Sequence, residues 1–360
     1  MKILVSGGCG FVGFSLLESF AELWPRGSGS LELYGVDNLS RAGSELNRRR
    51  LDKLGVKFFH GDLRLWSDLE HLPGVDLVVD ASANPSVLAG VDGKVSSRQL
   101  IEYNLNSTVN LLEFCRVHKS SFVLLSTSRV YSIGALSRLA VTMQNDAFAF
   151  DEAKNQTVGV SEKGISESFS VEPPVSIYGS TKLASEALAV EYGSAFNFPV
   201  WINRCGVLAG AGQFGKVDQG IVAFWLNAYL HRKPLKYIGF EGRGYQVRDF
   251  MHPKDLAALI VKQIDSTVST SQRTFNVGGG LQRAMSLAQL SAWCGNRFGV
   301  HEIHSADEER PYDIPWVVMD ATLAQRTWDW DCQDSLEEIL AEVAKHAEQH
   351  PDWLEISMRP

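Results

Sequence analysis

Short apolar runs alternate with helical patterns along the first half of the chain. Runs at 3–6, 31–37, 57–60, 76–82 and 122–126 predict strands, and several are apolar at successive positions, as expected for strands covered on both faces. The segments between them predict helices at 11–23, around 46–54 and at 99–118. This alternation predicts an α/β fold with a doubly wound parallel sheet.

The second half is more mixed and predicts a smaller α/β lobe interleaved with the sheet domain. A further strand is predicted at 200–204, and helices are predicted at 218–231, 253–264, 286–298 and 335–350. The segment 132–172 interrupts the alternation and is too long for a plain connection, so it is either a functional loop or disordered. We therefore expect a sheet domain at 1–205, with 245–278 returning to it, and a substrate lobe formed by 206–244 and 279–360.

Composition excludes several classes of partner. The 360 residues are 45% hydrophobic and 21% charged, which is ordinary for a globular protein. The net charge is −8 without a long basic run, so neither nucleic acid nor an anionic membrane is expected as a partner. No apolar stretch has the length of a signal peptide or a membrane span. Five scattered cysteines without metal-ligand spacing suggest reduced thiols, no metal site and a cytoplasmic location.

The segment “VSGGCGFVG” places Gly7, Gly10 and Gly13 directly after the first predicted strand and at the start of a helix. A tight turn and a close approach of the backbone to a pyrophosphate both require residues without a Cβ. The helix N-terminus then supplies N–H donors and a partial positive charge. In this context we interpret the segment as the phosphate loop of a Rossmann-type dinucleotide site.

The second predicted strand ends in “GVDNLSR”. Asp37 can accept hydrogen bonds from the adenosine ribose hydroxyls, and its charge repels a 2′-phosphate, which favours NAD over NADP. Arg41 lies nearby and could tolerate a phosphate, and the interval from Gly13 to Asp37 is slightly longer than usual. Asp62, in “HGDL” after the third strand, could bond the adenine amine.

The segment “SIYGSTKLASEALAVEY” places Tyr178 and Lys182 four residues apart, and therefore on one face of a predicted helix. Thr127 lies at the carboxyl end of the strand “FVLLSTSRVY”, over the expected ligand site. A lysine ammonium near the phenol would lower the phenol pKa from about 10 toward neutrality. The three residues thus form a proton-transfer set that acts on a sugar hydroxyl as hydride leaves for NAD.

These segments together resemble the extended short-chain dehydrogenases/reductases, specifically the nucleotide-sugar epimerases and dehydratases. The resemblance covers nearly the whole chain and rests on the three glycines, “DNLSR”, “HGDL”, “YNLNSTVNLLE”, Thr127, “YGSTK” and “QVRDFMHPKDL”. It implies an NAD-dependent enzyme with a nucleotide-sugar substrate, assembled as a homodimer or homotetramer. Thr127, Tyr178 and Lys182 are its expected catalytic residues, and Lys182 is also expected to bond the nicotinamide ribose.

The resemblance also implies a set of NAD contacts, with Asn104 near the nicotinamide. The expected contacts are Gly7, Gly10, Phe11, Val12, Gly13, Asp37, Asn38, Ser40, Arg41, Asp62, Leu63, Ala81, Ser82, Ala83, Asn104, Tyr178, Lys182 and Cys205.

Two substrate-lobe segments point to different relatives. “NRCGVLAGAGQFGKVDQGIVAFW” and “GRGYQVRDFMH” resemble the CDP-paratose 2-epimerases, whereas “RPYDIPWVVMDATLAQRTWDW” looks more like the UDP-glucose 4-epimerases. The chain departs from both groups. The 2-epimerases carry an arginine near Pro315, and the 4-epimerases place an asparagine where this chain has Val207.

Guanidinium groups suit phosphate oxygens, so Arg248 and Arg310 are expected to hold a diphosphate. Asp313 is expected to accept from the nucleotide ribose, and Gln213 and Gln219 to bond the diphosphate or the base. The sugar is expected to contact Asn84, Ser86 and Thr127. Other polar and aromatic residues are interpreted as structural: the caps and turns at Asp249, His252 and Asp255, and the core aromatics Phe224, Trp225, Trp316, Trp328 and Trp330.

The resulting hypothesis is an NAD-dependent epimerase of a nucleoside-diphosphate sugar, with C2 of a CDP-deoxyhexose ahead of C4 of a UDP-hexose. A 4,6-dehydratase usually has an Asp-Glu pair after the threonine, where this chain has Ser128 and Arg129. A nucleotide-sugar decarboxylase stays open, although nothing in the sequence demands a carboxylate pocket. A catalytically idle NAD sensor is the alternative outside enzymes, and the complete Thr127, Tyr178 and Lys182 set argues against it.

Overall fold

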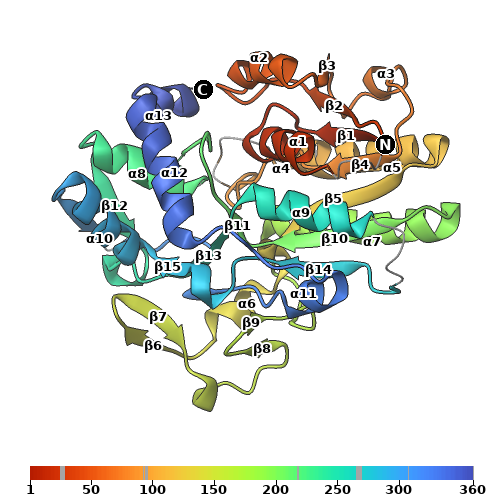
Figure 1. Ribbon diagram of the computed structural model, residues 1–360. Coiled ribbons are helices and arrows are strands. Elements are labelled where there is room, and N and C mark those ends of the chain that lie inside the picture. The colour runs from red at the N-terminus through yellow and green to blue at the C-terminus, as the bar shows by residue number, and fades with distance from the viewer. Residues whose placement is uncertain are drawn as a thin grey trace.

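The computed structural model of the chain describes residues 1–24, 29–91, 93, 96–216, 219–264, 270–306 and 308–359. Within this part, seven parallel strands form the central sheet in the order β14–β10–β5–β4–β1–β2–β3 (Figure 1). The strands are β1 (Lys2–Ser6), β2 (Glu32–Asp37), β3 (Lys57–His60), β4 (Leu77–Asp80), β5 (Ser121–Thr127), β10 (Val200–Cys205) and β14 (Thr274–Val277). The order reverses between β1 and β4, and ligands of such sheets bind beyond the carboxyl ends of the strands at this point.

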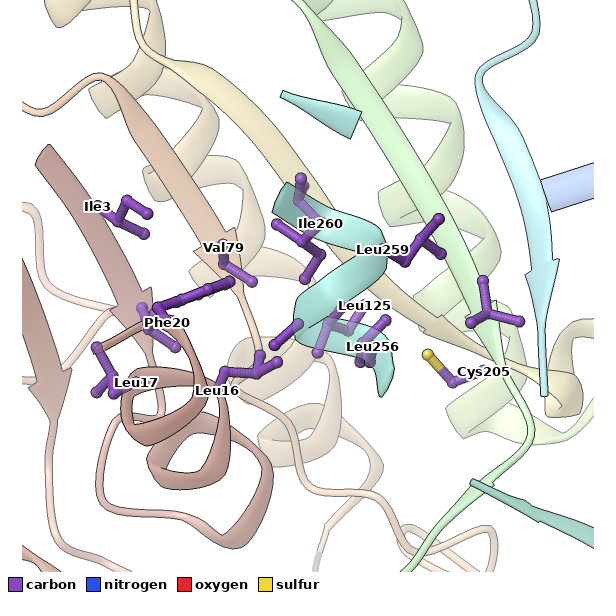
Figure 2. Packing of buried hydrophobic residues seen from close by; sticks show 14 of the residues in the cluster. Ile3, Leu16, Leu17, Phe20, Val79, Leu125, Cys205, Leu256, Leu259 and Ile260 are labelled. Carbon is purple, nitrogen blue, oxygen red and sulfur yellow. The ribbon is translucent and has the colours of Figure 1, made fainter. Parts of the chain in front are cut away.

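Helices cover both faces of the sheet (Figure 1). One face packs against α1 (Phe11–Leu23), α2 (Glu45–Lys53), α9 (Pro253–Gln263) and α11 (Thr322–Trp328). The other packs against α3 (Trp66–Leu69), α5 (Ser107–His118) and α7 (Ser176–Phe196), with α4 (Ser97–Ile101) and the π-helical turn η1 (Glu102–Asn106) preceding α5. Figure 2 shows the first core, in which Leu16 and Phe20 of α1 lie with Leu256 and Ile260 of α9 over the sheet.

A second lobe lies beside the carboxyl ends of β10 and β14. Its small sheet contains β11 (Val207–Leu208), β13 (Val247–Met251), β15 (Ala284–Ser286) and β17 (Trp316–Val317), and β12 (Leu235–Ile238) pairs with β16 (Ile303–Ala306). Its helical elements are α8 (Ile221–Leu230), α10 (Leu287–Phe298), α12 (Leu336–Gln349), α13 (Trp353–Met358), and the 3₁₀ turns η4 (Phe240–Gly242) and η5 (Leu281–Arg283). Trp225, Leu290 and Val343 belong to its core.

The insertion at 132–172 is folded. It contains α6 (Ile133–Ser137), the hairpin of β6 (Val141–Gln144) and β7 (Ala147–Phe150), η3 (Glu152–Lys154), and the hairpin of β8 (Val160–Ser161) and β9 (Gly164–Ile165), preceded by η2 (Ser128–Val130). Phe150 stacks on Trp316 with ring centroids 5.2 Å apart, and Ile165 is buried with Met319. Because its apolar side chains are buried against the β17 region, the disordered alternative is wrong for this segment.

The predicted elements of the first half are confirmed within one to three residues at most ends, apart from the predicted helix at 99–118, which is interrupted by η1. The strand β14 was missed. In the expected returning segment 245–278, α9 and β14 pack on the central sheet, whereas β13 joins the small sheet. The start of the helix predicted at 218 lies outside the described residues, and α8 begins at Ile221. The tryptophans that were interpreted as core residues are buried in the structure. This confirms the interpretation for Trp225, Trp316, Trp328 and Trp330.

Candidate active site

The glycine loop lies between β1 and α1 at the switch point. Gly7 has a φ of +64°, and a Cβ on Gly13 would overlap the carbonyl oxygen of Gly7, so both positions require glycine. Gly10 is the N-cap of α1, and its carbonyl accepts the first helical hydrogen bond, from the N–H of Phe14 at 2.9 Å. The N–H groups of the intervening residues 11–13 have no partner inside the helix and are suited to a pyrophosphate.

The end of β2 brings Asp37 against this loop. Its carboxylate accepts from the backbone N–H of Cys9 at 3.0 Å and from that of Leu39 at 2.7 Å. Burial raises the pKa of Asp37, while these backbone donors act in the opposite direction. Asn38 closes the same turn by accepting from the N–H of Ser40 at 3.1 Å. The glycine loop leaves room for a pyrophosphate, and the adjacent Asp37 carboxylate can accept from free ribose hydroxyls. The two features together fit a dinucleotide without a 2′-phosphate on its adenosine ribose.

The guanidinium of Arg41 is tied to the second lobe. Its Nη1 donates to Oε1 of Gln219 at 2.5 Å, its Nη2 donates to the carbonyl of Phe214 at 3.4 Å, and the group lies over the Phe214 ring at 5.6 Å. A 2′-phosphate would have to compete with these contacts. The structure therefore strengthens the preference for NAD that Asp37 indicates.

Asp62 follows β3, and its carboxylate is engaged by the neighbouring Arg64. The Nε of Arg64 lies 2.9 and 3.1 Å from the two carboxylate oxygens, and this side chain holds the pKa of Asp62 below its usual range. The carbonyl of Leu63 accepts from Nδ2 of Asn110 at 2.8 Å. An adenine amine would share the Asp62 carboxylate with Arg64.

The loop after β4 is fixed from two sides. The N–H groups of Ala81 and Ser82 donate to Oγ of Ser6 at 3.0 and 3.1 Å. Asn104, in the π-helical turn η1, accepts from the N–H of Asn84 at 2.8 Å and donates to its carbonyl at 3.2 Å. Asn104 therefore sets the path of 81–84, where Ala83 is exposed, across the expected nicotinamide position.

The proposed catalytic residues converge at the carboxyl end of β5. Thr127 ends this strand, and its hydroxyl acts on the phenol of Tyr178, which lies in the first turn of α7. Lys182 lies one turn further along α7 and is 2% exposed, against 6% for Tyr178. Cys205 pairs with Thr127 across β5 and β10, so it belongs to the same strand-end cluster.

The electrostatics of Tyr178 differ from the sequence prediction. Burial raises the pKa of Tyr178 to about 12, and the Thr127 hydroxyl and the charge of Arg129 only partly oppose this. The charge of Arg129 is thus one contribution to the phenol pKa that the sequence did not indicate. Burial lowers the pKa of Lys182, and the charges of Asp80 and Glu186 act against that effect. The predicted shift toward neutrality is wrong for the chain alone, because the sequence shows spacing but not the cost of burial.

A buried ion pair joins α7 to the strand β10 of the central sheet. Arg204 of β10 donates to both carboxylate oxygens of Glu186, with Nε 3.0 Å from Oε1 and Nη2 2.6 Å from Oε2, and Ser126 donates to the same carboxylate. Glu186 and Asp80 were missed by the sequence analysis. Glu186 follows Lys182 by four residues on one helix face, so its spacing was an available signal.

The expected diphosphate residues lie together in the second lobe. Arg248 of β13 is 4.0 Å from Asp313, and Oδ2 of Asp313 accepts from Nε2 of Gln246 at 2.9 Å. Burial and the charges of Arg129 and Arg310 lower the pKa of Arg248 to about 9. Arg129 thus belongs to the same cluster, although the sequence analysis assigned it no role.

Gln213 is placed differently from Gln219. Its Nε2 donates to the carbonyl of Leu208 at 2.6 Å, and its Oε1 accepts from the N–H of Ala223 at 3.4 Å. Its carboxamide therefore holds the loop before α8. Gln219 contacts Arg41, as described above, and joins the second lobe to the cofactor loop.

The structural interpretation of the “RDFMHPKD” residues is confirmed. Asp249 is buried and accepts from the N–H of Gly280 at 3.3 Å. His252 caps α9, because its Nδ1 accepts from the N–H of Lys254 at 3.1 Å. Asp255 accepts from the N–H of Gln333 at 2.9 Å. These residues join α9, β13 and the C-terminal segment.

The five cysteines are buried free thiols. In the described part of the chain, no group of three or more His, Cys, Asp or Glu side chains is arranged to hold a metal ion. In the same residues, no helix is both long and apolar enough to cross a membrane.

The fold and strand-end cluster define a Rossmann-type enzyme site for a nicotinamide dinucleotide. The profile of the NAD dependent epimerase/dehydratase family matches residues 3–278, and the chain belongs to this family. It is similar to CDP-paratose 2-epimerase of Salmonella typhi, at 29% identity over 81% of this chain and 82% of the relative. It is also similar to UDP-glucuronate 4-epimerase of Thermodesulfobacterium geofontis, at 25% identity over 96% of each chain.

Solved structures share the fold. The UDP-glucose 4-epimerase of Bifidobacterium longum, in complex with NAD⁺ and UDP, superposes with a TM-score of 0.77 at 20% identity, covering 98% of this chain and all of that one. The chain is thus an NAD-dependent enzyme.

Proposed function

We propose that this enzyme epimerises a nucleoside-diphosphate sugar through a transient keto sugar, with C2 of a CDP-deoxyhexose as the preferred reaction. The observation that carries the proposal is the cluster at the switch point: Tyr178 and Lys182 are buried one helical turn apart in α7, and Thr127, at the end of β5, acts on the Tyr178 phenol. Similarity to CDP-paratose 2-epimerase over 81% of the chain supports the choice of sugar carbon and base. C4 of a UDP-hexose is the alternative, supported by the likeness to a 4-epimerase over 96% of the chain.

Each residue has a distinct task in this proposal. Bound NAD supplies the hydride acceptor and, once reduced, the hydride donor. The glycine loop holds its pyrophosphate, Asp37 its adenosine ribose and Lys182 its nicotinamide ribose. Tyr178 takes the proton of the sugar hydroxyl and returns it, while Thr127 holds the same hydroxyl in line.

The substrate is held from the second lobe by Arg248 and Arg310, whose guanidinium groups pair with the diphosphate. Ser128 and Arg129 follow Thr127 where a 4,6-dehydratase usually has an acid pair, so elimination of water lacks its expected acid and base. The buried charges around Tyr178 also argue against an idle NAD sensor, which would have no need to bury a phenol and an ammonium together.

The test is incubation of the enzyme with the CDP-deoxyhexose in D₂O. Because hydride leaves and returns through NAD, the inverted carbon should carry no deuterium. Tyr178→Phe should abolish turnover while NAD stays bound, since the ring and its packing remain. Deuterium at the inverted carbon would show deprotonation beside a carbonyl instead, and failure to invert any CDP- or UDP-sugar would overturn the proposal.

A further inference from the structure

Arg129 connects the proton-transfer pair with the arginine cluster of the second lobe. Its backbone N–H donates to Oγ1 of Thr127 at 3.2 Å, so it helps to orient the threonine hydroxyl. Its carbonyl packs so closely on the first turn of α7 that Gly179 could not carry a Cβ there. Its Nη1 donates to the carbonyl of Tyr312 at 3.4 Å, within the turn that carries Arg310 and Asp313.

The cluster has an excess of positive charge. Among the described residues, the guanidiniums of Arg129, Arg248 and Arg310 act on one another. The carboxylate of Asp313 is 4.0 Å from Arg248 and already bonded by Gln246. Asp249 also acts on Arg248, but burial raises its pKa to about 7. Crowding buried cations is costly unless an anion is bound among them. The turn that positions Arg310 also holds Tyr312 at a φ of +59°, a strained conformation for a tyrosine.

The order of these groups gives a direction to the site. At one end the backbone of Arg129 contacts Thr127 beside Tyr178. At the other end its guanidinium contacts Tyr312, in the turn of Arg310 and Asp313, and Asp313 lies 4.0 Å from Arg248. A nucleotide sugar has the same order, since its reacting hydroxyl, its sugar-side phosphate and its nucleoside-side phosphate follow one another. In this alignment Arg129 meets the sugar-side phosphate.

We propose that Arg129 binds the sugar-side phosphate and, by holding it close to Tyr178, selects C2 as the oxidised carbon. This inference rests on the proposed function and deepens it. The hydroxyl of C2 is on the carbon adjacent to the phosphate-bearing anomeric carbon, whereas that of C4 lies across the ring. A phosphate anchored by a residue that also contacts Thr127 brings the C2 hydroxyl within reach of the phenol.

The first experiment measures binding of CDP and CMP to the NAD-loaded enzyme by calorimetry, with UDP and UMP as the second base. Arg129→Gln should weaken binding of the diphosphates CDP and UDP about tenfold or more and leave binding of the monophosphates unchanged. Only the diphosphates carry the phosphate that corresponds to the sugar-side phosphate of the substrate. Arg129→Lys should recover part of the loss, since it keeps the charge but not the fork. Arg138→Gln, at an exposed arginine on the same segment, is the matched control.

Equal losses for the diphosphate and the monophosphate, or no loss for either, would overturn the role of Arg129. A wild-type enzyme that binds neither CDP nor UDP would overturn both this inference and the proposed function.

The second experiment distinguishes the selection of C2 from the epimerase proposal itself. CDP-deoxyhexose carrying deuterium at C2 or at C4 is given to the enzyme, and the bound cofactor is examined by mass spectrometry during turnover. Label should reach the cofactor from C2 only. Transfer from C4 would overturn the selection of C2 while leaving the epimerase proposal intact, whereas no transfer from any position would remove the epimerase proposal itself.

Discussion

Tyr178 shows how strongly burial can oppose a nearby cation. Its pKa is raised to about 12 by burial, with Thr127 and Arg129 acting in the opposite direction. The phenol of the enzyme without NAD is therefore neutral at physiological pH. A positive charge brought to the site with oxidised NAD favours the phenolate and lowers this pKa.

We predict that Tyr178 in NAD-stripped enzyme shows no ionisation below about pH 10, and that its pKa falls when NAD⁺ is added. The measurement is an ultraviolet titration of the wild type minus that of Tyr178→Phe, which removes the contribution of the other tyrosines. Ionisation near pH 7 in the stripped enzyme would contradict the burial effect and restore Lys182 as the tuning cation.

Asp249 provides a pH-dependent test of stability. Burial raises its pKa from 3.8 to about 7, against several backbone N–H donors led by that of Gly280. Between about pH 4 and 7 the unfolded chain has lost this proton while the folded chain still holds it. The contribution of Asp249 to the free energy of unfolding therefore falls as pH rises, by at most about 1.4 kcal/mol per pH unit.

We predict that Asp249→Asn removes this fall, so that its free energy of unfolding relative to the wild type increases from pH 4 to pH 7. Urea unfolding at several pH values measures it. The exposed Asp52→Asn is the control, for which the difference should stay flat. If the free energy of unfolding of Asp249→Asn relative to the wild type does not change with pH, the Asp249 carboxylate of the folded wild type is ionised throughout this range.

At the scale of elements, the sequence predicted best where a single segment carried its own signal. Gly7, Gly10 and Gly13 lie in the turn that their spacing indicates. Tyr178 and Lys182 lie one turn apart in α7, and Thr127 ends β5 beside Tyr178, while their catalytic roles stay predictions. These positions depend on local turn chemistry, on helical spacing and on the rule that carboxyl ends of parallel strands share one edge.

The missed features depend on contacts between distant segments. The strand β14 has four residues, and its identity depends on pairing with β10 rather than on its own pattern. The fold of the insertion depends on Trp316 and Met319, which lie far along the chain. Arg129 belongs to no recognised motif, and the proposal for it depends on Tyr312 and Arg310, which only the fold brings beside it.

At the scale of the whole molecule, the side chain of Arg41 joins the proposed NAD site to the second lobe. Arg41 follows the Asp37 turn, which faces the expected adenosine ribose, and donates to Gln219 and to the carbonyl of Phe214 in the second lobe. Phe214 in turn stacks on Trp353 of α13 with ring centroids 5.2 Å apart, and Nε1 of Trp353 donates to the carbonyl of Gln213. Contacts of NAD with the ribose turn would therefore act through Arg41 on Phe214 and Gln219.

This connection predicts that NAD and the substrate nucleotide strengthen each other's binding, and that Arg41→Ala removes the effect. In the wild type, CDP should bind several-fold more tightly to the NAD-loaded enzyme than to the stripped enzyme, as expected for loss or gain of about one charged hydrogen bond. In Arg41→Ala the two CDP affinities should become nearly equal, while Arg49→Ala, at an exposed arginine of α2, should behave like the wild type. Coupling is reciprocal, so titration of NAD with and without CDP must give the same factor. Full coupling in Arg41→Ala would show that the two lobes communicate through other contacts.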